Sequence, residues 1–166
     1  MSSTIARKGE AASIWGDRET LEVLTFDING ETFALDATLV QEIVDVLPET
    51  KVPGSRAFVS SVINFRGKVI PLADIRLAFE MEAASETIDS RIIVIDLILN
   101  HEATMVGLKT DKVNEVTTFE KSSSEAPPSV GMRWRSDYIE CLVKRNGAFL
   151  IVPDLEAIFL SSQGRA

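Results

Sequence analysis

Few side chains in the sequence are of a type that supports acid–base, nucleophilic or metal chemistry. The chain of 166 residues has one histidine, His101, and one cysteine, Cys141. A zinc site built from histidine and cysteine would lack ligands, and no disulfide can form within the chain. A cysteine–histidine nucleophile would have to join these two residues. His101 stands in an expected turn and Cys141 has the apolar neighbours of a buried thiol, so neither is predicted to be catalytic.

Carboxylates are the remaining candidates, because acidic residues are numerous enough for a hydrolase with a carboxylate pair. Four of them recur at matching positions in two halves of the chain, which favours structural roles such as helix caps. These are Glu42, Asp74, Glu115 and Asp154. The sequence has no glycine-rich phosphate loop and no G-x-S-x-G motif. We therefore expect no enzymatic activity, no cofactor, no metal and no small-molecule substrate, although an enzyme using these carboxylates or Cys141 stays open.

Composition indicates a soluble globular protein with an acidic surface. Apolar residues make up 45% and charged residues 25%, and the formal net charge is −8. A negative surface repels phosphate, so nucleic acid is not an expected partner. The apolar run at 92–99 is far shorter than the about 20 residues of a membrane helix, and the N-terminus lacks the apolar stretch of a signal peptide. We expect a cytoplasmic protein without direct membrane insertion.

Short strands and tight turns dominate the expected local structure. LEVLTFDI at 21–28 and ETFALD at 31–36 flank Asn29-Gly30, a strong signal for a hairpin with a type I′ turn. The run at 91–99 is rich in β-branched residues and predicts a buried strand. Further elements are expected as a short helical turn or strand at 37–46, strands at 69–74 and 104–109, a hairpin of 137–143 with 148–152, and capped helices at 75–79 and 155–160.

An internal repeat organises these elements. GKVIPLADIRLAF, from Gly67, matches GAFLIVPDLEAIF, from Gly147, with glycine, aspartate and phenylalanine at identical spacing. VQEIV, from Val40, also matches VNEV, from Val113. Two copies of one small β unit explain these matches. Each copy would have about five short strands and would protect its edges by closing into a barrel, and the two barrels would pack along an apolar seam with a groove.

The expected domain organisation follows from this repeat. Residues 1–19 are polar and without period, which predicts a flexible N-terminal tail. Trp15 is expected to be exposed or weakly ordered, with docking on the domain as the alternative. Residues 20–160 form one domain of two intertwined β-barrel subdomains, at about 20–80 and 90–160. Residues 161–166 are expected to form a C-terminal tail.

The turn N-F-R-G presents an arginine for recognition. Arg66 follows an apolar run and precedes Gly67 at the tip of an expected hairpin. Arginine carries a planar fork of donors and is enriched at interfaces, whereas an exposed ion pair contributes only about 0.2–1 kcal/mol to stability. We therefore expect Arg66 to serve recognition more than folding.

Taken together, these segments resemble the CheW family, the coupling proteins of bacterial chemotaxis. Segments that carry the resemblance cover residues 20 to 160 in the order of the family. The most specific is VINFRGKVIPLADIR, which is similar to the family signature V-x-N-L-R-G-x-V-x-P-x-x-D-L-R. The resemblance implies a mostly β fold of two packed five-stranded SH3-like barrels.

The resemblance also implies a function and partners. Proteins similar to CheW are not enzymes, and they connect transmembrane chemoreceptors to the histidine kinase CheA. One barrel should pair with the opposite barrel of the regulatory domain of the kinase, and the groove between barrels should receive the helical hairpin tip of a receptor. Association with membrane receptor arrays would thus be indirect.

Seven positions of this chain match family positions at the receptor surface. By the resemblance, Glu42 and Arg66 approach each other beside the groove as an orienting pair. Val40, Ile92 and Val116 are expected to line the groove, with a plain core role as the alternative. Asn64 and Gly67 fall on the turn.

Departures from the family pattern leave a second function open. Ser61 stands where the family usually has glycine, Arg56 where it usually has proline, Phe65 for leucine and Cys141 for glycine. Ser61 and Arg56 are expected near the binding surface. The alternative is therefore a CheW-like adaptor that competes in signalling arrays, or positions them, without coupling to receptors.

Overall fold

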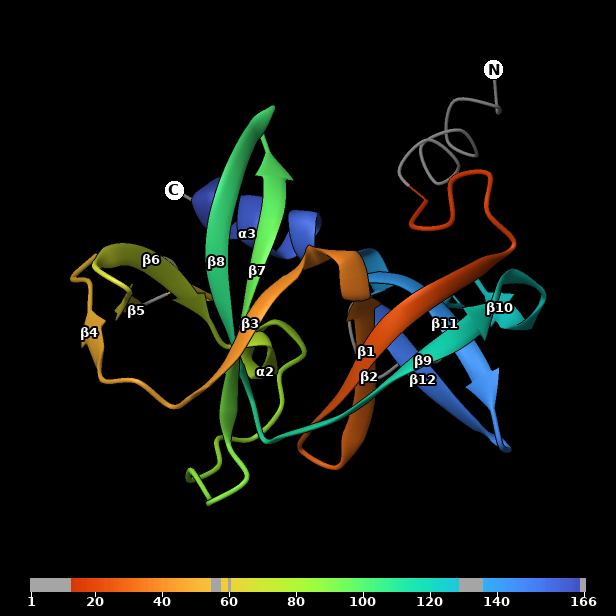
Figure 1. Ribbon diagram of the computed structural model, residues 1–166, viewed down its shortest axis with the longest axis horizontal. Coiled ribbons are helices and arrows are strands. Elements are labelled where there is room, and N and C mark those ends of the chain that lie inside the picture. Colours follow the sequence, from red (N-terminus) through yellow and green to blue (C-terminus); the bar gives the residue numbers. More distant parts are fainter. Residues whose placement is uncertain (1–12, 55–57, 60, 129–135, 165–166) are drawn as a thin grey trace.

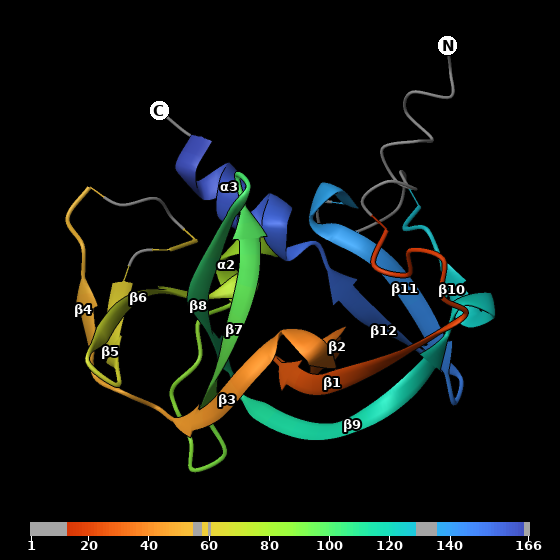
Figure 2. The same cartoon turned by 45° about the horizontal axis from the view of Figure 1, so that its top comes forward.

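The computed structural model describes residues 13–54, 58–59, 61–128 and 136–164, with side chains left out at 136 and 161–164. Two curled, mostly antiparallel sheets lie side by side, each with one parallel strand pair (Figures 1 and 2). Within the described residues each sheet has six strands, one more than the sequence predicted. The mostly β architecture of two small barrels is confirmed.

We name the two sheets barrel one and barrel two. Barrel one has the strand order β4-β5-β6-β8-β7-β3. Its strands are β3 (Val40–Asp45), β4 (Glu49–Lys51), β5 (Ser61–Phe65), β6 (Lys68–Ala73), β7 (Arg91–Leu99) and β8 (Glu102–Thr110). Barrel two has the order β10-β11-β12-β2-β1-β9. Its strands are β1 (Thr20–Ile28), β2 (Glu31–Asp36), β9 (Lys112–Glu120), β10 (Ser124–Glu125), β11 (Ile139–Arg145) and β12 (Ala148–Pro153).

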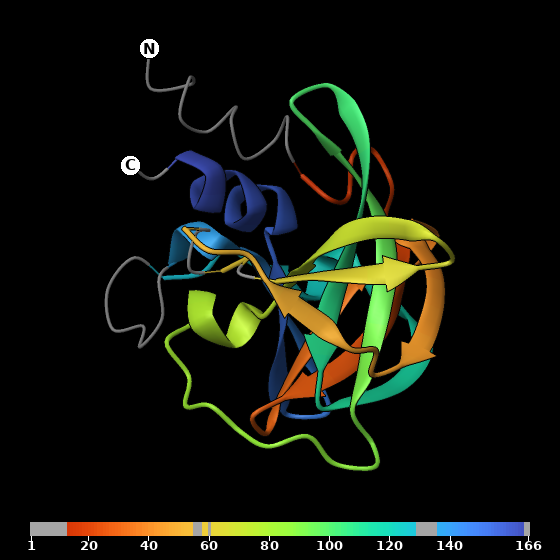
Figure 3. The ribbon, with the colours of Figure 1, turned by 90° about the vertical axis from the view of Figure 1, so that its left-hand side faces the viewer.

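Helical segments are short and join the strands. Three 3-10 turns are η1 (Ala37–Leu39), η2 (Lys121–Ser123) and η3 (Ser136–Tyr138), and two α-helices are α2 (Ile75–Ala78) and α3 (Leu155–Gly164). Figure 3 shows α2 and α3 on the same side of the strands of barrel one. The expected helical turn or strand at 37–46 is both, because η1 leads directly into β3. Helix α3 continues through Gly164, into the segment expected as a C-terminal tail.

The two barrels exchange their first hairpins. The hairpin β1–β2 joins barrel two and the hairpin β7–β8 joins barrel one, so the sheets do not coincide with the expected halves at 20–80 and 90–160. Parallel pairing closes each junction, with Leu72 opposite Gly107 and Ile151 opposite Phe33. Strand periodicity is the same whichever sheet receives a hairpin, which is why the sequence did not reveal the exchange.

The strand orders support the internal repeat. The two sheets have the same strand order. In it β3, β4, β5 and β6 of barrel one correspond to β9, β10, β11 and β12 of barrel two, and β7 and β8 correspond to β1 and β2. Asp74 accepts a hydrogen bond from the Arg76 N–H at 3.1 Å, and Asp154 accepts one from the Ala157 N–H at 3.0 Å. Both aspartates therefore cap helices, as predicted.

One sequence match does not keep its structural register. The nine-residue strands β1 and β7 begin at Thr20 and Arg91 and correspond to each other. Val23 pairs with Thr117 in barrel two, whereas Val94 pairs with Glu42 in barrel one. The structural counterpart of Glu42 is therefore Thr117 and not Glu115. A β-bulge interrupts each of these two pairings, but at a different position. The V-x-E motifs of the two halves therefore do not occupy equivalent positions in the two sheets.

Hairpin turns are those that the sequence predicted. Asn29 and Gly30 have φ angles of 55° and 81°, as a type I′ turn requires. Asn146 and Gly147 have φ angles of 53° and 80° between β11 and β12. In both turns the glycine accepts a backbone conformation that a side chain would strain.

Three apolar clusters fill the molecule. The largest lies between the barrels and includes Phe26, Phe33 and Phe79. The ring centroid of Phe33 is 5.8 Å from that of Phe26 and 5.5 Å from that of Phe79. A second cluster fills barrel one and a third fills barrel two. Trp15 belongs to the third cluster and is 4% exposed, which corrects the expectation of an exposed side chain. The seven other members of this cluster come from five strands, of which only β1 is close to Trp15 in sequence, so the local sequence pattern did not predict its burial.

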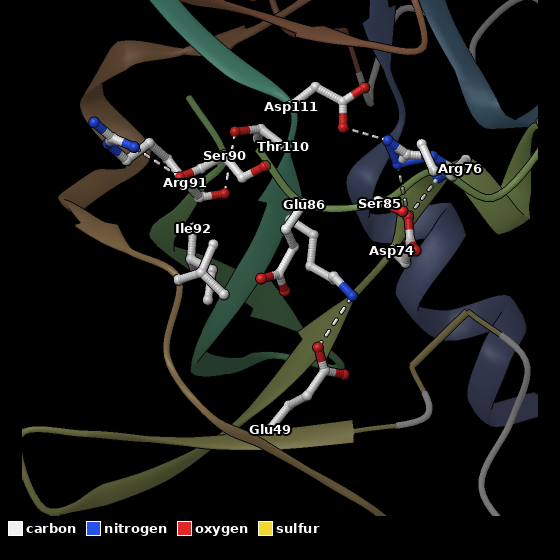
Figure 4. Close-up of a pocket in the computed structure, with 13 residues that line it drawn as sticks. Glu49, Asp74, Arg76, Ser85, Glu86, Ser90, Arg91, Ile92, Thr110 and Asp111 are labelled. Atoms are coloured by element: carbon white, nitrogen blue, oxygen red, sulfur yellow. Dashed lines mark hydrogen bonds and ion pairs between the residues drawn. The ribbon is translucent and has the colours of Figure 1, made fainter. Parts of the chain in front are cut away.

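A buried arginine joins the barrels where the chain crosses from one to the other. Asp111 lies between β8 of barrel one and β9 of barrel two. Arg76 of α2, whose side chain is 7% exposed, donates to the Asp111 carboxylate (Figure 4). The other carboxylate oxygen accepts from the Asn29 N–H at 2.7 Å, in the β1–β2 turn. Asp111 thus links α2 to barrel two, and sequence reasoning assigned neither residue this role.

Candidate functional site

The hairpin β5–β6 presents Arg66 at its tip. Arg66 and Gly67 have φ angles of 53° and 81°, which makes a two-residue type I′ turn. The Asn64 side-chain oxygen accepts a hydrogen bond from the Gly67 N–H at 2.8 Å. Asn64 and Gly67 therefore build the turn, and the tight turn fixes where the Arg66 side chain leaves the backbone.

Glu42 on β3 forms an ion pair with Arg66. The Arg66 side chain is 71% exposed and that of Glu42 is 34% exposed. The Arg66 guanidinium also lies 5.1 Å from the centroid of the Phe65 ring, so the phenylalanine found in place of the usual leucine supports the arginine by a cation–π contact. The structure brings these three residues together at one surface.

A surface recess of about 270 Å³ adjoins this ion pair. Its lining residues are Gln41, Glu42, Phe65, Arg66, Lys68 and Met105. The Gln41 side-chain amide donates to Asp96 at 2.6 Å, which ties the end of the recess to β7. Because an exposed ion pair contributes only about 0.2–1 kcal/mol, the Glu42–Arg66 pair serves mainly to hold a charged, directional surface.

The three apolar residues expected at a groove lie in different environments. Val40 is half-buried and packs against the cluster between the barrels. Val116 is 59% exposed on β9 of barrel two. Ile92 is 1% exposed inside barrel one, together with Val94, so it supports the surface from within and does not line a groove directly. Both faces of this part of β7 are buried: Ile92 and Val94 point into barrel one, and Ile93 and Ile95 point into the cluster between the barrels. Ile92 thus has the plain core role that was the alternative to lining a groove.

Ser61, expected near the binding surface, is instead 4% exposed. Its hydroxyl donates to Glu49 at 2.7 Å, and the Lys109 ammonium donates to the other Glu49 oxygen at 3.0 Å. Burial alone would raise the pKa of Glu49, but these two partners outweigh it and hold that pKa below its ordinary value. Ser61 is therefore part of a polar network in barrel one. Arg56 lies outside the described residues.

The side chains with potential for catalysis do not assemble. His101 is exposed in the β7–β8 turn, and Cys141 is 7% exposed inside barrel two. Glu42 and Asp74 line separate recesses. Among the described residues no group of three or more histidine, cysteine, aspartate or glutamate side chains could hold a metal ion.

The Cys141 thiol is the opposite of an activated nucleophile. Burial, and next the negative charge of Glu140, raise its pKa to about 11, and the nearby Trp15 side chain opposes this only in part. A thiol whose pKa is higher in the folded state than in the unfolded state makes the fold more stable at low pH than at high pH. This contribution declines as the unfolded chain begins to ionise, above about pH 8.

Cys141 should therefore make stability depend on alkaline pH. We expect the free energy of unfolding to fall by about 1 kcal/mol between pH 8 and pH 10 from this group. Urea unfolding of the wild type and of Cys141→Ala at both pH values isolates the effect, because other titrating groups are common to both. An equal pH dependence in the two proteins would contradict the prediction.

The structure is that of two small packed barrels with an exposed ion pair beside a surface recess. The side chains that could support catalysis lie apart from one another in the described residues. These features are those of a protein-interaction scaffold. Comparison with known proteins identifies the family. The family model described as the CheW-like domain matches residues 22–163. The chain belongs to the CheW family of chemotaxis coupling proteins.

Relatives and a solved structure agree with this family. The chain is 30% identical over 137 residues to the chemotaxis protein CheW of Bacillus subtilis, covering 82% of this chain and 85% of that protein. It is 26% identical over 145 residues to CheW of Treponema pallidum, covering 87% and 85%. The crystal structure of the scaffolding protein TtCheW from Thermoanaerobacter tengcongensis matches with a TM-score of 0.74 and 29% identity, over 84% of this chain and 87% of that one. None of the helices in the described residues is long and apolar enough to span a membrane.

Proposed function

We propose that this protein couples chemoreceptors to a CheA-type histidine kinase and catalyses no reaction itself. The observation that carries the proposal is the Glu42–Arg66 pair, at the family's receptor-surface positions, in a chain matched by the CheW-like family model over 22–163. Its relatives in Treponema pallidum and Bacillus subtilis are chemotaxis proteins and its structural neighbour is a scaffolding protein, which supports the same role.

The receptor surface would lie on barrel one, around the exposed ion pair. A receptor offers the tip of a helical hairpin, and a helix packed on a groove is a common recognition mode. Glu42 and Arg66 would orient that helix with polar contacts. Asn64 and Gly67 would hold the turn, Val40 and Val116 would contribute apolar contacts, and Ile92 would support the surface from inside barrel one.

The kinase would contact the protein through barrel surfaces that differ between the two halves. The positions in barrel two that correspond to Glu42 and Arg66 are Thr117 and Asn146, so barrel two has no equivalent ion pair. Two barrels of one fold thus present chemically distinct surfaces. Alternating contacts with a two-barrel regulatory domain can close into a ring, and many weak contacts in an array act together. The protein would then lie in the cytoplasm beneath receptor arrays.

The alternatives have less support. The competing-adaptor hypothesis depended on Ser61 and Arg56 altering the binding surface, but Ser61 is buried in the network with Glu49. An enzyme would need its carboxylates and Cys141 in one site, and Glu42, Asp74 and Cys141 lie in three different places.

Reconstituted kinase assays test the proposal. Purified protein is added to a CheA-type kinase from the same genome with receptors in membranes, and autophosphorylation is measured with and without receptor. A coupler raises the receptor-dependent rate. A fall in that rate would favour a competitor, and no binding to the isolated regulatory domain would remove both hypotheses.

A further inference from the structure

The described chain begins with a short segment outside both barrels and outside the region matched by the family model. We call residues 13–18 the clasp. Its backbone forms a turn in which the Gly16 N–H donates to the Ser13 carbonyl at 3.3 Å and the Arg18 N–H donates to the Trp15 carbonyl at 2.9 Å. The Ile14 N–H donates to the Glu140 carboxylate on β11 at 3.1 Å. The clasp is therefore an ordered element attached to barrel two.

Trp15 of the clasp closes the interior of barrel two. It packs against a cluster that contains Phe119 and Cys141 and is 4% exposed. Among the described residues, the corresponding position of barrel one holds no aromatic side chain. Glu86 stands as far before β7 as Trp15 stands before β1, and it lines a cavity of about 40 Å³ instead. The closure of barrel two is thus an addition to the repeated fold.

Arg18 connects the clasp to a crossover between the barrels. Its guanidinium donates to the carbonyl oxygens of Ile14 at 2.9 Å and Trp15 at 3.3 Å, and lies 3.6 Å from the carboxylate of Asp36. Asp36 ends β2 and accepts from the Thr38 N–H at 2.9 Å, which caps η1 where the chain passes to barrel one. The same arginine therefore closes the clasp turn and holds the crossover.

The attachment of the clasp has a weak point. The indole N–H of Trp15 is buried, and the partner it meets is the weakly accepting sulfur of Cys141, at a geometry poorer than that of an ordinary hydrogen bond. A buried donor with so weak an acceptor disfavours the closed position relative to one in which water reaches the donor. The Arg18 side chain is 49% exposed, so its ion pair with Asp36 holds only weakly.

We propose that residues 13–18 form a releasable clasp that opens without unfolding of the barrels. Closed, it seals barrel two and holds the first crossover through Asp36. Open, it uncovers the apolar end of barrel two and leaves Asp36 without its arginine. The proposal does not depend on the proposed function.

The single cysteine provides a direct measurement. Cys141 lies in the cluster that Trp15 covers, and the chain contains no other thiol. The full-length protein is treated with a thiol reagent at pH 8, and the labelling rate is followed at increasing urea concentrations below the unfolding midpoint. We expect a rate nearly independent of urea, because opening six residues exposes little surface. A rate that follows urea with the slope of global unfolding would overturn the proposal.

Variants separate clasp opening from loss of stability. We expect Trp15→Ala to raise the labelling rate at least about tenfold and Arg18→Ala to raise it about two- to fivefold, the second at a surface position that does not threaten folding. The matched control is Ile70→Ala, which removes a buried side chain of barrel one and should leave the rate within about twofold. A wild-type rate in Arg18→Ala, or an equal rise in Ile70→Ala, would overturn the proposal.

Discussion

Replacing Arg76 by methionine is expected to lower the free energy of unfolding by about 3 kcal/mol. Arg76 is 7% exposed and serves two carboxylates, donating to Asp111 and lying 3.8 Å from Asp74. Methionine fills similar space but leaves both carboxylates without their counter-ion in a partly buried site. Removal of one partner of a buried ion pair costs about 3–5 kcal/mol, and the partial exposure of the two aspartates places the expectation at the lower end.

Urea unfolding at pH 7 measures this effect. Arg91→Met is the matched control, because Arg91 has a side chain 37% exposed and lies 3.5 Å from Asp45, which is 90% exposed. We expect the control to cost less than about 0.5 kcal/mol. A loss below about 1 kcal/mol in Arg76→Met would show that Arg76 does not hold the barrels together.

The Arg76 network has a further consequence for geometry. Asp111 lies at the second crossover and accepts from both Arg76 of α2 and the Asn29 N–H of the β1–β2 turn. The first crossover carries Asp36, held by Arg18. Each passage of the chain between barrels thus carries an aspartate that contacts an arginine, but the Arg76–Asp111 contact is buried whereas Arg18 is half exposed and holds Asp36 only weakly. The Arg76→Met substitution should therefore loosen the packing between the barrels as well as lower the free energy of unfolding.

Reversing the charge of Arg66 is expected to abolish receptor-dependent kinase activation, with at least about a tenfold loss, while changing the free energy of unfolding by less than about 1 kcal/mol. The side chain is 71% exposed, so it contributes little to the fold. Glutamate at this position would repel Glu42 and would offer acceptors where a partner meets donors. The reconstituted kinase assay and thermal unfolding measure the two effects.

Two further variants show whether position or net charge matters. Lys121→Glu makes the same charge change at an exposed position of η2, outside the recess beside the ion pair, and should retain most of the activation. Combining Arg66→Glu with Glu42→Arg restores an ion pair of opposite polarity, and recovery of activation would indicate that the pair acts by fixing geometry. A large loss of stability in Arg66→Glu would instead make Arg66 structural, and equal loss in Lys121→Glu would reduce the effect to net charge.

Local features of the chain followed directly from its sequence. The Asn29-Gly30 and Asn146-Gly147 turns need positive φ, which few residues accept, so residue type identifies them. Asp74 and Asp154 cap helices because a short carboxylate before an apolar run reaches the free N–H groups of the first turn. The repeated spacing of these turns and caps predicted two copies of one β unit, and the Arg66 motif identified the family before any contact was known.

Long-range features needed the tertiary structure. Which sheet receives each first hairpin depends on pairings such as Leu72 with Gly107, and strand alternation is identical in either arrangement. Burial of Trp15 depends on partners from five separate strands, so a polar segment around it suggested a tail. Ser61 is buried in barrel one, where its hydroxyl donates to Glu49, which also accepts from Lys109.

The sequence by itself determined the turns, the caps, the repeated unit and the family, because each depends on residue types within a few positions of one another. Only the tertiary structure decided the exchange of hairpins, the closure of barrel two by Trp15 and the aspartates held at the crossovers. Those depend on which distant segments share a surface, and the free energy that selects them arises from burial and charge pairing across the whole chain.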